Sequence, residues 1–314
     1  MQQNSEKSEK KEENIKELLF SGGAGCIGFM MGYLHGLIEI VGKEELKKYK
    51  LGGVSAGNAA ALFFHMTLHQ DKYDMKYFHQ QEISKYFSKM NKKYGGLFTN
   101  YKVIHDNSMN YWKLLSEFGE QIPDINGIYH CVVTEWNGWF KFKKTIIDDF
   151  KNKENLSTAI QSSCQIPLFT SPSVFTSHNG KKLMDGGFVG SIPYKYENSQ
   201  KIFLNMMPKV CNFFANLRKE PKNLTIFNIT DGQGVIFPRD YYIWSEEWND
   251  EMFLKGYFSA IGNIQEICKA FGISQNRVKN STKQENQINQ ENQNQNQNQK
   301  SYQYYDKRNA QYTV

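Results

Sequence analysis

Residues 49–64, YKLGGVSAGNAAALFF, decide the fold of this chain. An apolar run ends in glycines, Ser55 follows at the centre of Gly53-Val54-Ser55-Ala56-Gly57, and a second apolar run comes directly after. This order predicts a strand, a tight corner and a helix. Gly53 and Gly57 leave out side chains that would clash at such a corner, and the Ser55 hydroxyl is exposed at the strand's end. The corner therefore indicates a nucleophile. A packing turn that happens to contain a serine is the alternative.

The segment before this corner repeats its arrangement. IKELLFSGG (residues 15–23) is a short apolar run that ends in glycine. GFMMGYLHGLIEIVG (residues 28–42) has helical spacing, with Phe29, Tyr33 and Leu37 on one face. Two successive strand–helix units with short connections are typical of a parallel sheet with helices on its faces.

Later segments add further strands. The Asn-Gly pairs at 137–138 and 179–180 each separate two strand-like runs, which predicts two hairpins. The run KNLTIFNIT (residues 222–230) is expected to be a core strand. Together these patterns predict an α/β fold, a three-layer α/β/α sandwich with a mainly parallel central sheet.

The composition favours a large intracellular protein. With 39% hydrophobic residues in 314, the chain can fill a sizeable core, and its net charge of +6 is scattered, unlike the dense basic stripe of a nucleic-acid-binding protein. The five cysteines are far apart and cannot all pair, which fits a reducing compartment. The first residues lack a signal peptide's apolar region, and no apolar run approaches the ~18 residues of a membrane span. We expect a cytoplasmic protein, free or peripheral on membranes or lipid droplets.

Three segments are expected along the chain. Residues 1–14 are charged and polar and are predicted to form a disordered arm. Residues 273–314 are predicted to form a disordered tail, because they contain a tract dominated by Asn and Gln that cannot build a core. Residues 15–272 show no internal repeat or flexible linker and are predicted to be one domain.

A carboxylate stands at the end of another predicted strand. KKLMDGG (residues 181–187) places Asp185 directly before Gly186 and Gly187, which on its own is a natural turn. Because sites in α/β proteins gather at the carboxyl ends of the strands, Asp185 can meet Ser55 there and take its proton. No histidine follows His178 and none lies in a marked loop, so the sequence shows no Ser-His-Asp triad.

The glycine-rich loop LFSGGAGCIGF (residues 19–29) is the third part of the candidate site. Beside the serine corner in a parallel sheet, its backbone N–H groups would form an oxyanion hole. The expected donors are Gly22, Gly23, Ala24 and Gly25, together with Ala56. The alternative is a dinucleotide-binding loop, because Gly23, Gly25 and Gly28 fit Gly-x-Gly-x-x-Gly. That fingerprint expects an acid closing the second strand, and KLGGVSAGN has none.

In this order the motifs resemble the patatin-like phospholipase family. Residues 21–28, 53–57 and 185–187 match its oxyanion loop, Gly-x-Ser-x-Gly elbow and Asp-Gly-Gly/Ala motif, and AIQSSCQIPLFTSP (residues 159–172) is similar to the segment before its aspartate. The resemblance covers residues 17–193. It implies a patatin-like domain over residues 15–272 that hydrolyses lipid acyl esters with a Ser55–Asp185 dyad and needs no metal or cofactor. The implied partner is a phospholipid or neutral glyceride at a membrane or lipid surface, and not a nucleic acid.

One segment departs from the family pattern Gly-Gly-Gly-x-Arg/Lys-Gly. An ungapped match puts Cys26 where the family has a basic residue, and Gly28 falls one position late. Ala24 can still donate its N–H if its backbone needs no positive φ. We expect a serine acyl hydrolase of the phospholipase A, lysophospholipase or lipase type. The alternatives are a catalytically weak homologue that binds lipid or protein, and a thioesterase or acyltransferase using the same dyad.

Overall fold

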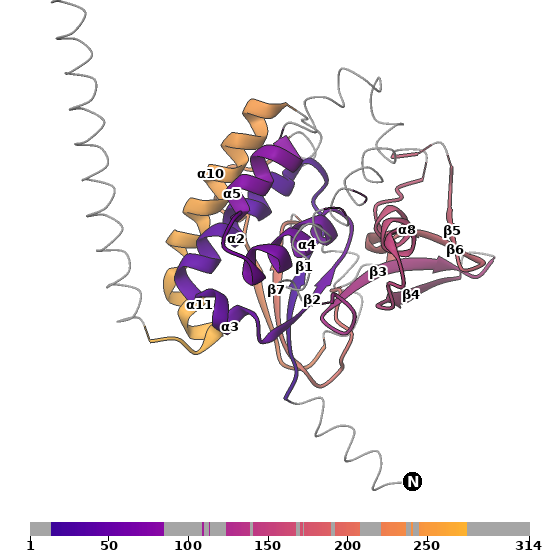
Figure 1. Ribbon diagram of the computed structural model, residues 1–314, viewed down its shortest axis with the longest axis horizontal. Coiled ribbons are helices and arrows are strands. Elements are labelled where there is room, and N and C mark those ends of the chain that lie inside the picture. Colours follow the sequence, from indigo (N-terminus) through magenta and orange to yellow (C-terminus); the bar gives the residue numbers. More distant parts are fainter. Residues whose placement is uncertain are drawn as a thin grey trace, which may run out of the picture. The chain divides into compact units, whose positions relative to one another are not determined.

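A computed structural model of the chain describes residues 14–84, 109, 113, 124–138, 141–167, 170–171, 173–189, 192–207, 221–236, 240 and 245–274 (Figure 1). Contacts between residues divide the chain into two units, Met1–Ile264 and Gln265–Val314, and the first unit holds the sheet. The segments 1–14 and 273–314 lie outside the described residues except for Asn14, Ile273 and Ser274, so their disorder stays a prediction.

Within the described residues, the central sheet has eight strands in the order β5-β6-β3-β2-β1-β7-β8, with β4 also paired to β3. The strands are β1 (Lys16–Phe20), β2 (Tyr49–Gly53), β3 (Tyr129–Trp136), β4 (Phe142–Ile147), β5 (Thr176–His178), β6 (Lys181–Asp185), β7 (Gln200–Asn205) and β8 (Leu224–Asn228).

Parallel pairing places β1 at the centre of the sheet. Leu18 of β1 lies opposite Leu51 of β2 on one side and Ile202 of β7 on the other, and parallel pairs also join β2 to β3 and β7 to β8. The β3–β4 and β5–β6 pairs are the two antiparallel hairpins expected at the Asn-Gly turns, and β6 also pairs antiparallel with β3. The predicted α/β class with a mainly parallel central sheet is confirmed.

The end of the sheet formed by β7 and β8 differs from what the sequence predicts for residues 222–230. The run KNLTIFNIT forms β8, but β8 pairs only with β7 among the described strands, and its Ile226 is 39% exposed. The expectation of a core strand there is wrong, because an apolar run does not reveal whether a strand lies at an edge. The buried strand is β7, in which Ile202 and Leu204 are covered. This strand is not among those predicted from the sequence.

Helices surround the sheet (Figure 1). Helix α4 contacts β1 and β2, α8 contacts β3, β5 and β6, and α2 contacts both α4 and α10. The helical segments are η1 (Ala24–Cys26), α2 (Ile27–Val41), α3 (Lys43–Leu46), α4 (Ala56–His69), α5 (Met75–Phe78), η2 (His79–Ser84), α8 (Lys153–Ser163), η5 (Gly186–Val189), α10 (Glu246–Gly262) and α11 (Ile264–Phe271).

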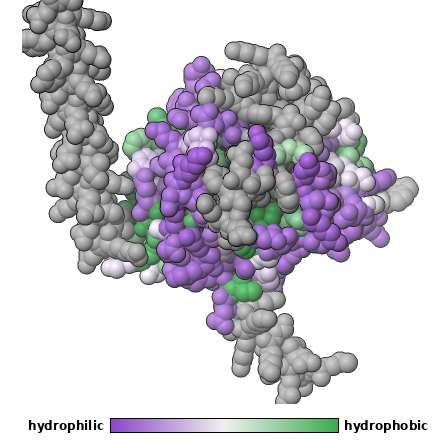
Figure 2. All heavy atoms as spheres, in the orientation of Figure 1, coloured by the Kyte–Doolittle hydropathy of each residue, from purple (hydrophilic) through white to green (hydrophobic). Residues whose placement is uncertain are grey.

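The helix that follows β1 is unusually apolar. Residues Ala24–Val41 are long and apolar enough to cross a membrane by length and composition, and 78% of this stretch is buried inside the protein. The expectation that no run approaches membrane length is therefore wrong. In the fold this stretch forms η1 and α2, and the buried positions of α2 run around most of its circumference. Figure 2 shows hydrophilic residues over most of the visible face of the molecule, with smaller hydrophobic areas between them.

Helices α2 and α10 approach each other backbone to backbone. Gly28, Gly32 and Gly36 recur every four residues and so share one face of α2. A Cβ atom on Gly32 would overlap the carbonyl group of Phe253 in α10, and one on Gly36 would lie 2.8 Å from the Ala260 Cβ. The absence of side chains on this face of α2 therefore sets the distance between the two helices.

We expect Gly32→Ala to lower the free energy of unfolding by about 2 kcal/mol or more, because the added methyl group overlaps backbone that cannot move aside easily. The matched control is Gly262→Ala in α10, where a Cβ meets nothing within 4 Å. There we expect stability to be unchanged or raised by up to about 1 kcal/mol. Urea unfolding of both variants checks this, and equal effects would contradict the proposed contact.

Candidate active site

Ser55 occupies a strained corner between β2 and α4. Its φ of 53° and ψ of −131° are rare for a residue with a side chain. Such a conformation costs on the order of 1–3 kcal/mol and persists only where the surroundings enforce it. A Cβ on Gly57 would lie 2.5 Å from the Ser21 carbonyl oxygen, and one on Gly53 would lie 2.5 Å from Asn58 Oδ1. Both glycines are therefore required by close packing, and the predicted strand, corner and helix are present.

A hydroxyl from a distant helix holds this corner. Ser163 Oγ, at the end of α8, accepts hydrogen bonds from the Ser55 N–H (3.0 Å) and from Asn58 Nδ2 (2.9 Å), and it donates to the Val132 carbonyl (2.6 Å). The Tyr129 hydroxyl in turn donates to Asn58 Oδ1 (2.7 Å). Ser163 thus uses its one donor and two acceptor positions and ties α8, β3 and α4 to the serine corner.

Asp185 ends β6 at the same edge of the sheet. It lies opposite Val133 of β3 and is only 5% exposed. Its Oδ1 accepts a hydrogen bond from the Gly187 N–H (2.7 Å), and its carbonyl accepts one from the Thr134 hydroxyl (2.7 Å). Burial raises the pKa of the Asp185 carboxyl to about 6, and hydrogen bonding from Gly187 and the Ser55 hydroxyl offsets part of that rise.

The structure brings Ser55 and Asp185 together. The Ser55 hydroxyl is near enough to lower the pKa of the Asp185 carboxyl, yet Asp185 Oδ2 is buried and forms no full hydrogen bond with any described residue. One carboxylate oxygen is therefore fixed by the backbone and the other is left for a proton donor. Gly22 borders the pair, since a Cβ there would lie 3.6 Å from Ser55 Oγ.

The glycine-rich loop lies beside Ser55, as expected. Within the part of the chain that the structure describes, four backbone N–H groups of the loop and one next to Ser55 make no hydrogen bond. They belong to Gly22, Gly23, Ala24, Gly25 and Ala56. The loop is anchored by Ser21, whose Oγ accepts a hydrogen bond from the Met206 N–H (2.7 Å) and donates to the Gly22 carbonyl (2.9 Å). Unused donors at the start of a helix suit a developing negative charge.

The backbone of Ala24 has a positive φ, contrary to the condition under which alanine could replace glycine there without strain. Its φ is 46°, in the left-handed region that favours glycine. An alanine there is strained by roughly 1–2 kcal/mol, because its Cβ approaches the following carbonyl oxygen. The glycine that the family has at this position is therefore replaced at a conformational cost.

Two buried thiols near the site stay protonated. Cys26 is fully buried and its Sγ donates to the Asp240 carbonyl (3.5 Å), and burial together with the Asp240 carboxylate raises the pKa of its thiol to about 12. Burial and the Asp185 carboxylate raise the pKa of the Cys164 thiol well above its ordinary value. Neither thiol forms the thiolate that a cysteine nucleophile requires.

Three of the described histidines are bonded elsewhere or lie far from Ser55 along the chain. His130 is buried, its Nε2 is 2.6 Å from the Pro193 carbonyl, and burial lowers its pKa to about 4. His79 bonds Asp250 (2.9 Å), and His65 lies ten residues along α4 from Ser55, about 15 Å away. His105 lies outside the described residues. Among the residues described, no group of three or more His, Cys, Asp or Glu is placed to hold a metal ion.

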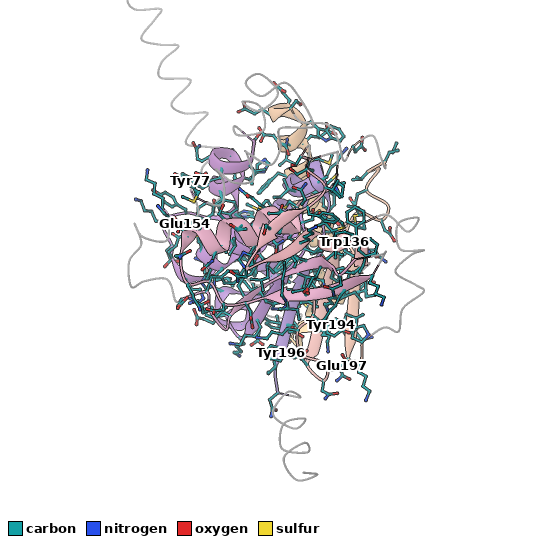
Figure 3. The ribbon with its side chains drawn as sticks, turned by 90° about the vertical axis from the view of Figure 1, so that its right-hand side faces the viewer. Tyr77, Trp136, Glu154, Tyr194, Tyr196 and Glu197 are labelled. Atoms are coloured by element: carbon teal, nitrogen blue, oxygen red, sulfur yellow. The ribbon has the colours of Figure 1, made fainter. Side chains whose placement is uncertain are left out.

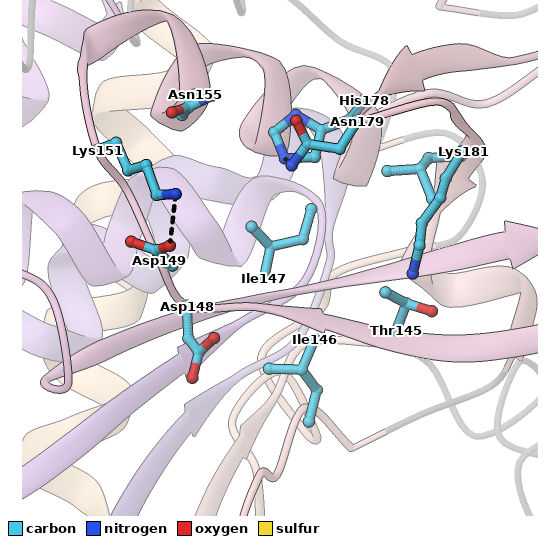
Figure 4. Close-up of a pocket in the computed structure, with 11 residues that line it drawn as sticks. Thr145, Ile146, Ile147, Asp148, Asp149, Lys151, Asn155, His178, Asn179 and Lys181 are labelled. Atoms are coloured by element: carbon cyan, nitrogen blue, oxygen red, sulfur yellow. Dashed lines mark hydrogen bonds and ion pairs between the residues drawn. The ribbon is translucent and has the colours of Figure 1, made fainter.

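A cavity of about 270 Å³ lies apart from this site (Figure 4). It contains neither Ser55 nor Asp185, and its lining comes from residues 145–149, Lys151, Asn155, His178, Asn179, Lys181 and Leu183. Its lysines already face acids, with Lys151 3.6 Å from Asp149 and Lys181 3.0 Å from Glu135. The serine corner, and not this cavity, therefore carries the candidate chemistry.

An α/β sheet that presents a serine corner, an acid and a donor-rich loop at one edge is the architecture of a hydrolytic enzyme. The family model described as patatin-like phospholipase matches residues 18–196, and the chain belongs to this family, whose activity is lipid hydrolysis. Among solved structures, the crystal structure of VipD from Legionella pneumophila is similar, with a TM-score of 0.46 and 11% identity over 81% of this chain and 67% of that chain. No curated protein sequence matches the chain.

The supporting residues Ser163, Asn58, Tyr129 and Met206 were not singled out from the sequence. The signal for Ser163 was its place in QSSCQIP, the segment similar to the family's, but nothing in that segment shows that its hydroxyl reaches the Ser55 backbone. The contact spans 108 positions along the chain.

We expect Ser163→Ala to lower kcat for ester hydrolysis by roughly 10- to 100-fold, because the serine corner loses the group that fixes it. Stability should fall by about 1–3 kcal/mol, since the Ser55 N–H and the Asn58 amide lose their acceptor. The matched control is Ser162→Ala, whose hydroxyl donates to the Thr158 carbonyl of its own helix (2.7 Å). Equal loss of kcat in both variants would refute the role of Ser163.

Proposed function

We propose that the chain hydrolyses carboxylic esters of lipids, glycerophospholipids above all, with Ser55 as nucleophile and Asp185 as general base. One observation carries the proposal. A strained serine corner stands beside a buried carboxylate whose pKa is about 6 and whose Oδ2 has no partner among the described residues. A base of that pKa accepts a proton near neutral pH and can return it in the next step.

In the first half of the reaction, Ser55 Oγ attacks the ester carbonyl carbon and its proton passes to Asp185 Oδ2. The carbonyl oxygen becomes an oxyanion, and the unused N–H groups of the loop and of Ala56, with the positive end of α4, stabilise it. Collapse of the tetrahedral intermediate breaks the ester bond. The departing alkoxide takes the proton back from Asp185, and the acyl group remains on Ser55.

In the second half, water replaces the alcohol. Asp185 takes one proton from the water as its oxygen attacks the acyl carbon, and the same donors hold the second oxyanion. When this intermediate collapses, Ser55 Oγ leaves and recovers its proton from Asp185, and the fatty acid is released. We place the enzyme in the cytoplasm, working at the surface of membranes or lipid droplets.

A catalytically weak homologue is the second candidate, and Ala24 is the observation that favours it. A loop strained at φ 46° holds its donors less favourably than the family's glycine would. Fatty-acid release from phospholipid, neutral glyceride and acyl thioester, measured side by side, separates a lipid hydrolase, a thioesterase and a protein that binds without turnover.

We expect Ser55→Ala and Asp185→Asn each to reduce fatty-acid release by roughly 10³-fold or more, while the far-ultraviolet circular dichroism stays that of the native fold. The double variant should be no less active than either single variant, because the two groups act in one step. Substantial activity in Asp185→Asn would mean that another residue serves as the base.

The rate should depend on the ionisation of Asp185. Because only the carboxylate accepts the Ser55 proton, kcat/KM on a soluble short-chain ester should rise with pH through about 6 and level off above. A rate independent of pH from about 5 to about 8 would contradict this assignment.

The contribution of Asp185 to the free energy of unfolding should fall as the pH rises, over the same range in which the rate rises. The folded pKa of about 6 lies above the ordinary value of 3.8, so burial of the carboxylate opposes folding above about pH 6 and not below about pH 4. Asp185→Asn removes this charge, so the variant should gain stability relative to the native chain as the pH rises through that window. Thermal unfolding at acid and neutral pH tests it.

A further inference from the structure

Aromatic side chains gather on one face of the sheet next to the site. Trp136, the last residue of β3 (Figure 3), lies directly opposite Phe142 of β4, so both side chains point to the same face. The Phe175 ring stacks on Trp136 with 4.7 Å between ring centroids, and Lys182 Nζ lies 4.8 Å from the Trp136 ring. We call these four residues, with Phe188, the aromatic face.

Phe188 joins the aromatic face to the catalytic edge. It belongs to η5, which starts directly after Asp185 and contacts both β3 and β4. The chain beyond η5 stays on this face, because the Lys144 amino group, in register with Thr134 and so on the same side as Trp136, donates to the Ile192 carbonyl. Phe188 therefore lies three residues along the chain from the proposed base, whose side chain, in register with Val133, points to the other face of the sheet.

The aromatic face is partly open to solvent. Phe142 is 44% exposed and Phe188 is 50% exposed. Rings of this size dominate the energetics of contact surfaces when they are covered, and Trp with Phe is typical of the boundary between lipid and water. A face that leaves two Phe rings half in water suits contact with an apolar surface.

The charge around the aromatic face is positive. Lys182 lies over the Trp136 ring, and the exposed Lys141 adjoins Phe142; neither makes an ion pair within the part of the chain that is described. The nearby acid Glu135 points to the other face, where it bonds Lys181 (3.0 Å) and Thr145. Cations around exposed aromatic rings complement a lipid surface with anionic headgroups.

A second exposed apolar stripe lacks this charge. Leu254, Phe258 and Ile261 lie on one side of α10, and the same side continues into Glu247 and Glu251. Glu251 pairs with Lys255 (2.7 Å), and Glu247 adds a further acid at that end, which opposes contact with anionic lipid. The stripe therefore serves as an internal comparison of similar apolar character without an excess of positive charge.

We propose that the aromatic face docks the domain onto a phospholipid surface that carries anionic headgroups, with the Ser55–Asp185 edge at the lipid. The inference rests on the proposed function, because a docked edge would let an ester reach Ser55 directly from the surface. Phe142 and Phe188 enter the boundary of the bilayer, and Lys182 faces its headgroups.

Binding is tested with the Ser55→Ala chain, which keeps lipid intact, and vesicles of three parts phosphatidylcholine to one part phosphatidylserine. Flotation should show association that drops on vesicles of phosphatidylcholine alone. On the mixed vesicles, Phe142→Ala should weaken association roughly 10-fold. Lys182→Glu should weaken it roughly 5-fold or more. The matched control is Phe258→Ala on α10, which should bind like its parent.

Activity separates this inference from the proposed function. In the Ser55-containing chain, Phe142→Ala and Lys182→Glu should slow hydrolysis of the mixed vesicles and leave hydrolysis of a soluble short-chain ester unchanged. Unchanged vesicle binding in both variants, or an equal loss in Phe258→Ala, overturns the docking surface while the dyad stands. Full activity of Ser55→Ala overturns the proposed function, and the flotation result remains valid.

Discussion

The serine corner depends on one hydroxyl group. Ser163 Oγ accepts hydrogen bonds from the Ser55 N–H and the Asn58 amide and donates one to the Val132 carbonyl, so β3, α4 and α8 are joined at one point. A left-handed serine is unfavourable by itself and must be held by its surroundings. The bonds of Ser163 to Asn58 and Val132 are buried and that to the Ser55 N–H is partly buried, so they are stronger than they would be in water, and loss of a buried partner leaves a group unsatisfied.

The small number of hydrogen bonds to the Asp185 carboxylate likewise affects its pKa. A carboxylate that accepts several backbone N–H groups is held ionised and is a poor base. Here the Gly187 N–H orients Oδ1, while Oδ2 has no partner among the described residues, and burial raises the pKa to about 6. The single backbone hydrogen bond orients the carboxylate and leaves Oδ2 able to accept a proton. The Ser55 hydroxyl is near enough to lower that pKa.

Local rules explain what the sequence could predict. Gly53 and Gly57 are demanded by contacts within a few ångströms of the corner, and the Asn-Gly turns need only their own residues, so these features were visible in short segments. The position of β7 between β1 and β8, and the reach of Ser163 to Ser55, depend on residues far apart in the chain. No short pattern contains them. The positive φ of Ala24 was also hidden, because the sequence shows the substituted residue and not the backbone that the fold imposes on it.

The order in which the chain is synthesised leaves the glycine face of α2 uncovered for a time. Residues Ala24–Val41 leave the ribosome before α10, which covers Gly32 and Gly36 and follows roughly 200 residues later. At ordinary rates of synthesis this interval is on the order of 10–40 s. For that time a helix of membrane length is without its partner, and a bilayer offers it the same apolar surroundings. Synthesis of α10 therefore completes the protein surroundings that compete with a bilayer for this apolar helix.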